Sequence, residues 1–214
     1  MSNSHKPQMT QSLSEVLENI KNPRRWIEPE ALIQLIIDNP SLRGFAYGYV
    51  SEHSFSSYLD SLGITGHFKE DDHKKTKADR TFVYRGRQYT IQLKSLQTNS
   101  LEQEGPGRFR AKVQNDASDR RKIKLPNRKT LETTCYQVGE YDVLGVSLQP
   151  FVSEWQFAFK KNKDLKRTTS KKYPKSVQKY LLSTLEDISF PLTDDWTTDL
   201  LSLLSDPSLG QKPK

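Results

Sequence analysis

The feature that most restricts the possible folds of this chain is a change in the spacing of its apolar residues close to residue 79. Before it, apolar residues recur at the spacing of an amphipathic helix. After it, two β-rich runs at 81–84 and 89–93 alternate with a period of two and flank residues 85–88, which supply the glycine that a tight hairpin needs. Helices followed by paired strands predict a mixed α/β (α+β) fold.

The remaining elements follow from the same signals of periodicity, glycine and proline. The expected elements are helices at 13–20, 29–39 and 42–63, a second hairpin from 121–125 and 130–136, strands at 141–148 and 155–159, and helices at 177–188 and 194–204. Residues 101–110 contain Gly105-Pro106-Gly107 and are interpreted as a mobile loop.

The length of 214 residues suits one sizeable core. We expect a single domain at 11–204, between flexible tails at 1–10 and 205–214. Its parts would be a helical N-terminal part (11–63), a sheet core (79–160) and C-terminal helices (173–204).

The composition excludes several classes of protein. Apolar runs such as residues 31–37 are too short to cross a bilayer, and the N-terminus has no hydrophobic signal region. We therefore expect a soluble, cytoplasmic protein. The single cysteine, Cys135, has no partner for an internal disulfide, and no Cys/His cluster has the spacing of zinc ligands.

Positive charge is concentrated in two segments. Residues 65–130 contain 17 basic and 8 acidic residues, and residues 160–179 contain 9 basic residues against Asp164 alone. Because the net charge of the whole chain is only +7, the rest of the chain is acidic. Such segregation favours a polyanionic partner, although lysines also serve simply to keep a surface hydrated.

The first hairpin carries the polar residues that are the strongest candidates for an active site. Along residues 89–94, alternation puts Gln92 and Lys94 on one face of the strand and Ile91 and Leu93 on the other. The turn brings the start of the first strand back toward the end of the second, so Asp79 can approach both. One carboxylate, one amide oxygen and one ammonium would then converge.

Such a set fits phosphodiester hydrolysis. Oxygen ligands hold Mg²⁺, and a lysine can orient or deprotonate the attacking water and stabilise the transition state. A plainer interpretation also fits: Asp79 follows a loop, and Gln92 and Lys94 form the solvent-facing side of an edge hairpin.

The order of helices, Asp79, hairpin, Gln92-Leu93-Lys94 and further strands resembles the PD-(D/E)xK (restriction-endonuclease-like) nuclease superfamily. Three further segments resemble bacterial restriction-endonuclease-related proteins: residues 39–45 (NPSLRGF), 116–121 (DASDRR) and 139–146 (GEYDVLGV). The resemblance runs from about Asn39 to about Asp164. The resemblance implies a central mixed sheet flanked by helices, with Asp79 as the metal-binding carboxylate, Gln92 as the second ligand and Lys94 as the catalytic lysine.

One departure from the superfamily pattern matters. Position 92 is glutamine where most members have glutamate, so the site has one negative charge fewer and would bind metal more weakly without help. Related nucleases often add a glutamate from a helix, which makes Glu52 the expected helper; alternatively, Glu52 simply faces solvent. Residues 71–73 (DDH) are a further acidic cluster, interpreted as a solvated loop. Asp142 either supports the ligands or merely opens a core strand.

Basic and amide side chains on both sides of this site would contact DNA. The expected DNA-binding residues are Lys74, Lys75, Lys77, Arg108, Arg110, Lys112, Gln114, Arg120, Arg121 and Lys122. Asn115, like Gln114, either reads base edges or forms turns.

These expectations lead to a Mg²⁺-dependent DNA endonuclease, in the manner of a Type II restriction enzyme of a restriction-modification system. We expect Mn²⁺ to substitute for Mg²⁺, and a homodimer on double-stranded DNA follows from the superfamily and from duplex symmetry. A non-catalytic nucleic-acid-binding module on the same fold is the alternative. A surface for an acidic protein or a membrane is a third, although the chain has no basic amphipathic helix with a strong apolar face.

Overall fold

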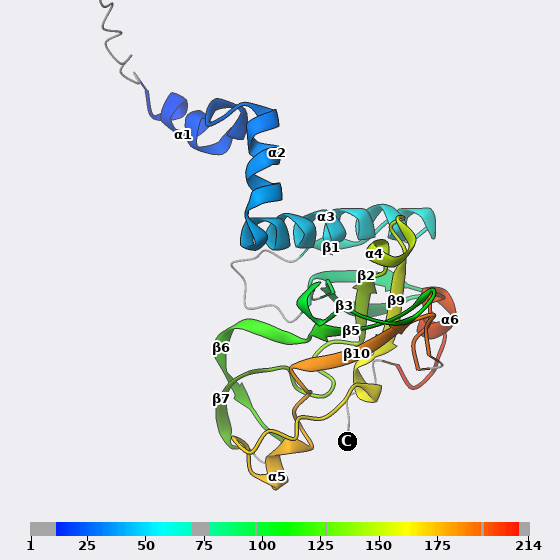
Figure 1. Cartoon of the computed structure of the whole chain (residues 1–214). Helices are drawn as coiled ribbons and strands as arrows, with labels where there is room; N and C mark the ends of the chain where they lie inside the picture. The colour runs from blue at the N-terminus through cyan, green and yellow to red at the C-terminus, as the bar shows by residue number, and fades with distance from the viewer. Residues whose placement is uncertain (1–11, 70–77, 97, 127, 194, 210–214) are drawn as a thin grey trace, which may run out of the picture. The chain divides into compact units, whose positions relative to one another are not determined.

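The computed structural model describes residues 12–69, 78–96, 98–126, 128–193 and 195–209. The chain forms two compact units, Met1–Tyr47 and Gly48–Lys214. Each unit is described by itself (Figure 1).

The first unit is helical, as the apolar spacing predicts. It contains α1 (Leu13–Lys21), a short 3-10 turn η1 (Pro23–Arg25), α2 (Pro29–Asp38) and the start of α3 (Pro40–Ser61). Ser12 caps α1, because its hydroxyl accepts a hydrogen bond from the backbone N–H of Glu15 at 3.2 Å. None of the ten residues of α2, all of which the structure describes, is buried.

The second unit is built on a five-stranded mixed sheet, which confirms the expected fold class. Its strand order is β1 (Phe68–Lys69), β2 (Arg80–Tyr84), β3 (Arg87–Lys94), β8 (Val143–Ser147) and β9 (Phe157–Lys161). Strands β2 and β3 form the predicted hairpin, and its turn residues Arg85 and Gly86 both have positive φ, as two-residue hairpin turns require. Strand β3 pairs with β8 in parallel, whereas β8 and β9 are antiparallel.

Helices cover one face of this sheet. Phe55 and Leu59 of α3 pack with Ile91 and Leu93 of β3 in one apolar cluster, which also contains residues of α6 (Leu200–Leu204). Leu209 belongs to the same cluster and is 2% exposed, although the sequence predicts a flexible tail from residue 205. The described part of that segment therefore contributes to the core.

A second sheet covers the opposite face. Its order is β10 (Leu185–Phe190), β5 (Arg108–Gln114) and β4 (Glu102–Gly105). The prediction of a mobile loop at 101–110 is wrong, because Gly107 adopts a positive φ and turns the chain into a β4–β5 hairpin. Burial of Ala111 and Val113 against the central sheet stabilises this hairpin, which the glycine-rich turn alone does not indicate.

The predicted C-terminal helices are largely wrong. Among the described residues of this region, only α5 (Lys175–Gln178) and α6 are α-helices, and Leu185 and Ile188 lie on strand β10. Their spacing of three fits a helix, but Ile188 is 2% exposed in the apolar cluster beneath β5. Pairing with β5 along the whole strand overrides the local helical signal.

The second predicted hairpin is confirmed by strands β6 (Asp116–Lys124) and β7 (Thr130–Cys135), which form a separate two-stranded sheet among the described strands. A short helix α4 (Gln149–Val152) and two 3-10 turns, η2 (Thr98–Ser100) and η3 (Asn162–Asp164), complete the unit. Among the described residues, no helix combines the length and the apolar character needed to cross a membrane.

Candidate active site

Asp79 lies immediately before β2 and is held against β3. Its backbone N–H donates to the carbonyl of Ile91 at 3.0 Å. One oxygen of its carboxylate accepts two hydrogen bonds, from the side-chain amide of Gln92 at 2.5 Å and from the backbone N–H of Leu93 at 2.7 Å. Because β2 begins only at Arg80, the N–H of Leu93 is open to this carboxylate rather than to a strand partner.

Gln92 and Lys94 lie on the same face of β3, as alternation predicts. Their parallel neighbours on β8 are Leu144 and Val146, and both of these are fully buried. Gln92 is only 4% exposed, and β3 lies at the centre of the sheet. The plainer interpretation, in which these residues form the wet side of an edge hairpin, is therefore wrong.

Lys94 is fixed by two contacts at the end of β3. Its ammonium donates to the backbone carbonyl of Asp116 at 3.1 Å, and its nitrogen lies 5.6 Å from the ring centroid of Tyr136. A cation over an aromatic face is stabilised by the negative charge of the ring face. The ammonium is also close enough to Asp79 to favour its ionised form.

The pKa of the Asp79 carboxyl is raised above its ordinary value. Burial is the main cause, because a carboxylate removed from water loses hydration. The charge of Lys94 and the N–H of Leu93 act in the opposite direction, the nearby charge of Glu52 raises the pKa further, and the amide of Gln92 lowers it. A bound cation would relieve both unfavourable effects.

Glu52 reaches this site from α3. Arg80, at the start of β2, donates to the backbone carbonyl of Glu52 at 3.1 Å and to the hydroxyl of Ser56 at 3.0 Å. These bonds hold the helix against the start of β2, and the negative charge of Glu52 contributes to the raised pKa of Asp79. Asp79, Gln92 and Lys94, the residues expected to be catalytic, thus lie at one end of β3, and Glu52, the expected additional metal ligand, is on the helix that Arg80 contacts.

The donor set fits a hard divalent cation. Within the described part of the chain, no group of three or more His, Cys, Asp or Glu residues is arranged to hold a metal ion. Asp79, Glu52 and the amide oxygen of Gln92 supply two carboxylates and one neutral oxygen. Mg²⁺ commonly binds through one or two carboxylates and keeps several water ligands, so the chemistry of these side chains is compatible with Mg²⁺.

Tyr136 is a component of the site that the sequence does not reveal. It is 7% exposed, and the guanidinium carbon of Arg121 lies 4.9 Å from its ring centroid. Burial raises the pKa of the Tyr136 hydroxyl above its usual range, and the negative charge of Asp79 adds to this shift. The tyrosine follows β7 directly, and the pattern of residues 130–136 predicts a strand but no role for its last residue.

Arg121 has a structural partner. Its guanidinium forms an ion pair with Glu140, with one nitrogen 2.8 Å from Oε2, and the side chain of Glu140 is 1% exposed. Glu140 also accepts a hydrogen bond from the backbone N–H of Gln137 at 2.7 Å. Arg121 therefore braces the segment that carries Tyr136, which leaves its expected DNA contact as a prediction only.

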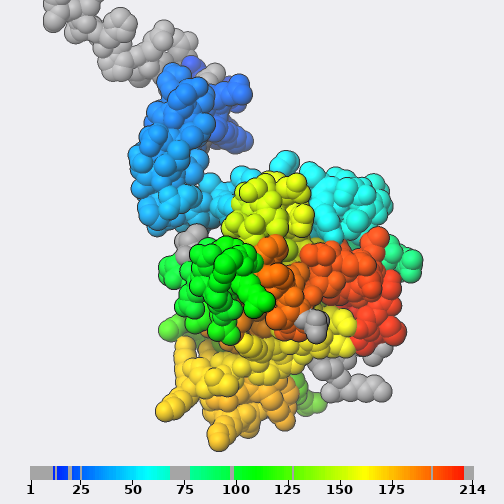
Figure 2. All heavy atoms as spheres, turned by 45° about the vertical axis from the view of Figure 1, so that its right-hand side comes forward, coloured from blue at the N-terminus to red at the C-terminus, as the bar shows by residue number. Residues whose placement is uncertain are grey.

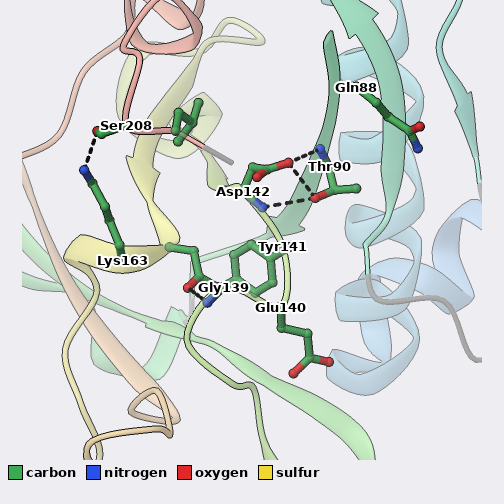
Figure 3. A pocket seen from close by; sticks show the side chains of 10 residues that line it. Gln88, Thr90, Gly139, Glu140, Tyr141, Asp142, Lys163 and Ser208 are labelled. Carbon is green, nitrogen blue, oxygen red and sulfur yellow. Dashed lines mark hydrogen bonds between the residues drawn. The ribbon is translucent and has the colours of Figure 1, made fainter. Parts of the chain in front are cut away.

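Asp142 acts away from Asp79, in a cavity of about 260 Å³ (Figure 3). Its carboxylate accepts hydrogen bonds from the backbone N–H of Thr90 at 2.8 Å and from the Thr90 hydroxyl at 3.0 Å. Figure 3 shows Asp142 pointing toward Thr90 and Glu140 pointing away from it. Asp142 joins the start of β8 to β3, so it supports the sheet rather than the ligands.

The expected DNA-binding residues of β5 lie on one exposed face. Arg108, Arg110, Lys112 and Gln114 alternate with inward-facing residues. The same face also carries acidic side chains, because Arg110 lies 3.7 Å from Glu104 of β4 and Lys112 is opposite Asp187 of β10. This surface is therefore less positive than the sequence of β5 alone indicates.

The remaining residues expected to contact DNA differ in their exposure. Arg120 and Lys122 are exposed on β6. Asn115 is fully buried, and its side-chain oxygen accepts a hydrogen bond from the Tyr141 hydroxyl at 2.8 Å, so the prediction that it could read bases is wrong. Lys74, Lys75 and Lys77 and the acidic cluster at 71–73 lie outside the described residues.

The sequence matches no family model and no curated protein. Among solved structures, the chain is similar to a bacterial homing endonuclease, I-Ssp6803I, with a TM-score of 0.36 and 16% sequence identity. The similar region covers 63% of this chain and 85% of the endonuclease. A likeness of this size assigns no activity to the chain, so the interpretation of the site depends on its geometry.

Proposed function

We propose that this chain is a divalent-metal-dependent DNA endonuclease. The observation that carries the proposal is the convergence of the Asp79 carboxylate, the Gln92 amide and Lys94 at the end of a buried central strand. A buried carboxylate, a neutral oxygen donor and a fixed ammonium are the groups that metal-assisted phosphodiester hydrolysis uses. The positive segments beside the site favour nucleic acid as the source of the phosphodiester.

Each residue has a separate task. Asp79, Glu52 and Gln92 would hold Mg²⁺ or Mn²⁺, which when bound neutralises phosphate charge and lowers the pKa of a water ligand. Lys94, as an ammonium, would orient the attacking water and stabilise the negative charge that develops on the phosphate. The carbonyl of Asp116 and the ring of Tyr136 keep the Lys94 ammonium at one place.

Because position 92 is glutamine, the negative charge of Glu52 is important for the proposed metal site. A glutamine ligand removes one negative charge from the metal site, and the carboxylate of Glu52 restores it. We place both carboxylates in the metal site for this reason.

We further propose a Type II restriction enzyme that acts on double-stranded DNA as a homodimer. Duplex symmetry favours a two-fold enzyme. The first unit offers apolar side chains for self-association, because Ile33, Ile37 and Phe45 are each more than half exposed. Its acidic and basic residues are nearly balanced in number, so a second copy would not be repelled by charge.

The test is cleavage of mixed plasmid DNA with Mg²⁺ or Mn²⁺. We expect the wild-type protein to cut, and Asp79→Ala and Lys94→Ala to lose at least ~10²-fold in rate. Lys163→Ala is the matched control, because this exposed lysine donates to Ser208 in the cavity away from Asp79. Equal behaviour of all four proteins would overturn the proposal.

The alternative is a DNA-binding module without catalysis on the same fold, in which Gln92 marks a weakened metal site. It predicts salt-sensitive binding of duplex DNA with no cleavage in either metal. An acidic protein or membrane partner instead predicts binding that DNA does not compete.

A further inference from the structure

The basic segment at 160–179 divides into two parts with different uses. Lys160 is 5% exposed and donates to Glu186 at 2.7 Å and to Asp195 at 2.5 Å. Lys161 pairs with Asp206, and Lys166 pairs with Asp187. Lys160, Lys161 and Lys166 are therefore each paired with a carboxylate of the same unit.

The second part keeps its charge at the surface. Lys171, Lys172, Lys175 and Lys179 are all exposed and lie in α5 or within a few residues of it, in the segment drawn yellow to orange in Figure 2. Residues 165–183 contain no acidic residue. Within the described residues, none of these four lysines forms an ion pair with a carboxylate.

The structure joins this segment to the β6–β7 hairpin, as Figure 1 shows for α5 and β7. Tyr173 and Val177 pack with Ile123 and Leu125 in a separate apolar cluster. The hydroxyls of Tyr173 and Thr133 are hydrogen-bonded at 2.6 Å and buried. We call the β6–β7 hairpin and residues 168–182 together the basic lobe.

The hairpin contributes positive charge of its own. Arg120, Lys122, Lys124 and Arg128 are exposed, and residues 116–135 contain six basic residues against three acidic ones, Asp116, Asp119 and Glu132. Two stretches that are far apart in the sequence therefore place their basic side chains on one small structural element.

The basic lobe is anchored to the candidate active site. The backbone N–H of Leu182 donates to the carbonyl of Tyr136 at 2.8 Å, and Lys94 contacts Asp116, the first residue of β6. The six residues of β7 extend ~20 Å from there at ~3.4 Å per residue. At ~3.4 Å per base pair, that length spans ~6 base pairs of duplex.

The surface chemistry selects the partner. Within the described residues of the basic lobe, no large apolar side chain is exposed, so it has nothing to insert into a membrane. Lysine is depleted in protein–protein interfaces, whereas phosphate contacts to nucleic acid depend on it.

We propose that the basic lobe binds the phosphate backbone of duplex DNA beside the cleavage position, independently of sequence. This inference rests on the proposed function, because it takes the DNA at Asp79 and Lys94 as the reference point. The lobe would hold the flanking duplex and leave base recognition to other elements.

The experiment measures duplex binding in EDTA, where no cleavage occurs, with full-length protein and two labelled duplexes. One has ~8 base pairs and extends only ~14 Å to each side of its centre, short of the ~20 Å reach of the lobe; the other has ~40 base pairs and provides flanking DNA within that reach. The four lysines at 171, 172, 175 and 179 are changed together to glutamine or, as a charge-conserving control, to arginine. We expect the glutamine variant to lose at least ~10-fold in affinity for the longer duplex, with a salt slope lower by up to ~0.9 per lost contact. The arginine variant keeps the affinity of the parent.

The outcomes separate the two proposals. If the glutamine variant binds the longer duplex like the parent, the inference about the lobe is wrong, whether or not the wild-type protein cuts plasmid. If the lobe effect is present but the wild-type protein never cuts, the lobe stands and the endonuclease proposal fails. Equal losses on both duplexes, or tighter binding of single-stranded RNA than of duplex, would also overturn a contact with flanking DNA.

Discussion

Gln92 donates its side-chain amide to the carboxylate of Asp79 across 2.5 Å, deep in the sheet. This hydrogen bond offsets part of the free-energy cost of burying the Asp79 carboxylate, because it lowers the pKa that burial raises. A glutamate at this position would instead face a second carboxylate at hydrogen-bonding distance.

This contact predicts a metal-dependent stability for Gln92→Glu. Two adjacent carboxylates repel unless one is protonated or a cation lies between them. Loss of a hydrogen bond to a charged group costs ~1.5–3 kcal/mol, which at ~2–4 °C per kcal/mol lowers the melting temperature by several degrees in EDTA. We expect Mg²⁺ to restore most of the loss. Gln88→Glu, at an exposed position of β3, is the control; a Gln92→Glu protein as stable as wild type in EDTA would contradict the expectation.

The raised pKa of Asp79 predicts that Asp79→Asn stabilises the metal-free protein at neutral pH. Because burial raises the pKa in the folded state above that of the unfolded chain, this group favours folding below its unfolded pKa and loses that contribution as pH rises through the folded pKa. The advantage of the asparagine variant should therefore shrink as pH falls. Thermal unfolding of both proteins between neutral and acidic pH measures this difference in stability. A difference in melting temperature that grows as the pH falls would refute the prediction.

Tyr136 is a positioning residue for Lys94. Tyr136→Leu removes the aromatic face under the ammonium, and at ~1 kcal/mol for a partly desolvated cation–π contact we expect cleavage to slow by ~5–10-fold. Tyr136→Phe keeps the ring and should restore nearly the full rate. The loss should appear in kcat with KM unchanged, because DNA contacts are intact. A change confined to KM, or equal losses in both variants, would exclude this role.

The Arg121–Glu140 pair predicts a large effect on folding. Glu140→Gln leaves the guanidinium without its buried counter-charge, and breaking such a pair costs ~3 kcal/mol or more. Glu154→Gln, at an exposed position, is the control and should change little. Urea unfolding of both proteins tests the difference, and a loss below that of the control variant would show that the pair contributes no stability.

The sequence predicted the elements in which local signals and tertiary packing agree. The β2–β3 hairpin has both a turn glycine and strict alternation, so Asp79, Gln92 and Lys94 could be placed on one face in advance. Strand β10 could not be predicted from the sequence, because Leu185 and Ile188 have helical spacing and form a strand only by pairing with β5.

The residues around Lys94 could not be predicted from the sequence for a similar reason. Tyr136 and Asp116 reach Lys94 through the pairing of β6 with β7, where a register irregularity lies between Asp116 and Arg121. No local pattern encodes that irregularity. The use of Arg121 as a partner for Glu140 likewise depends on a contact between residues that are distant in the sequence.

The parallel pairing of β3 with β8 sets the order in which the site can be completed. The β2–β3 hairpin is local and can form early, but β8 can join it only after residues 95–142 have been synthesised and closed into a crossover. Such non-local pairings are slow steps of folding. Asp79, Gln92 and Lys94 therefore leave the ribosome before the strand that supports them, and a growing chain carries the reactive groups without the buried sheet that positions them.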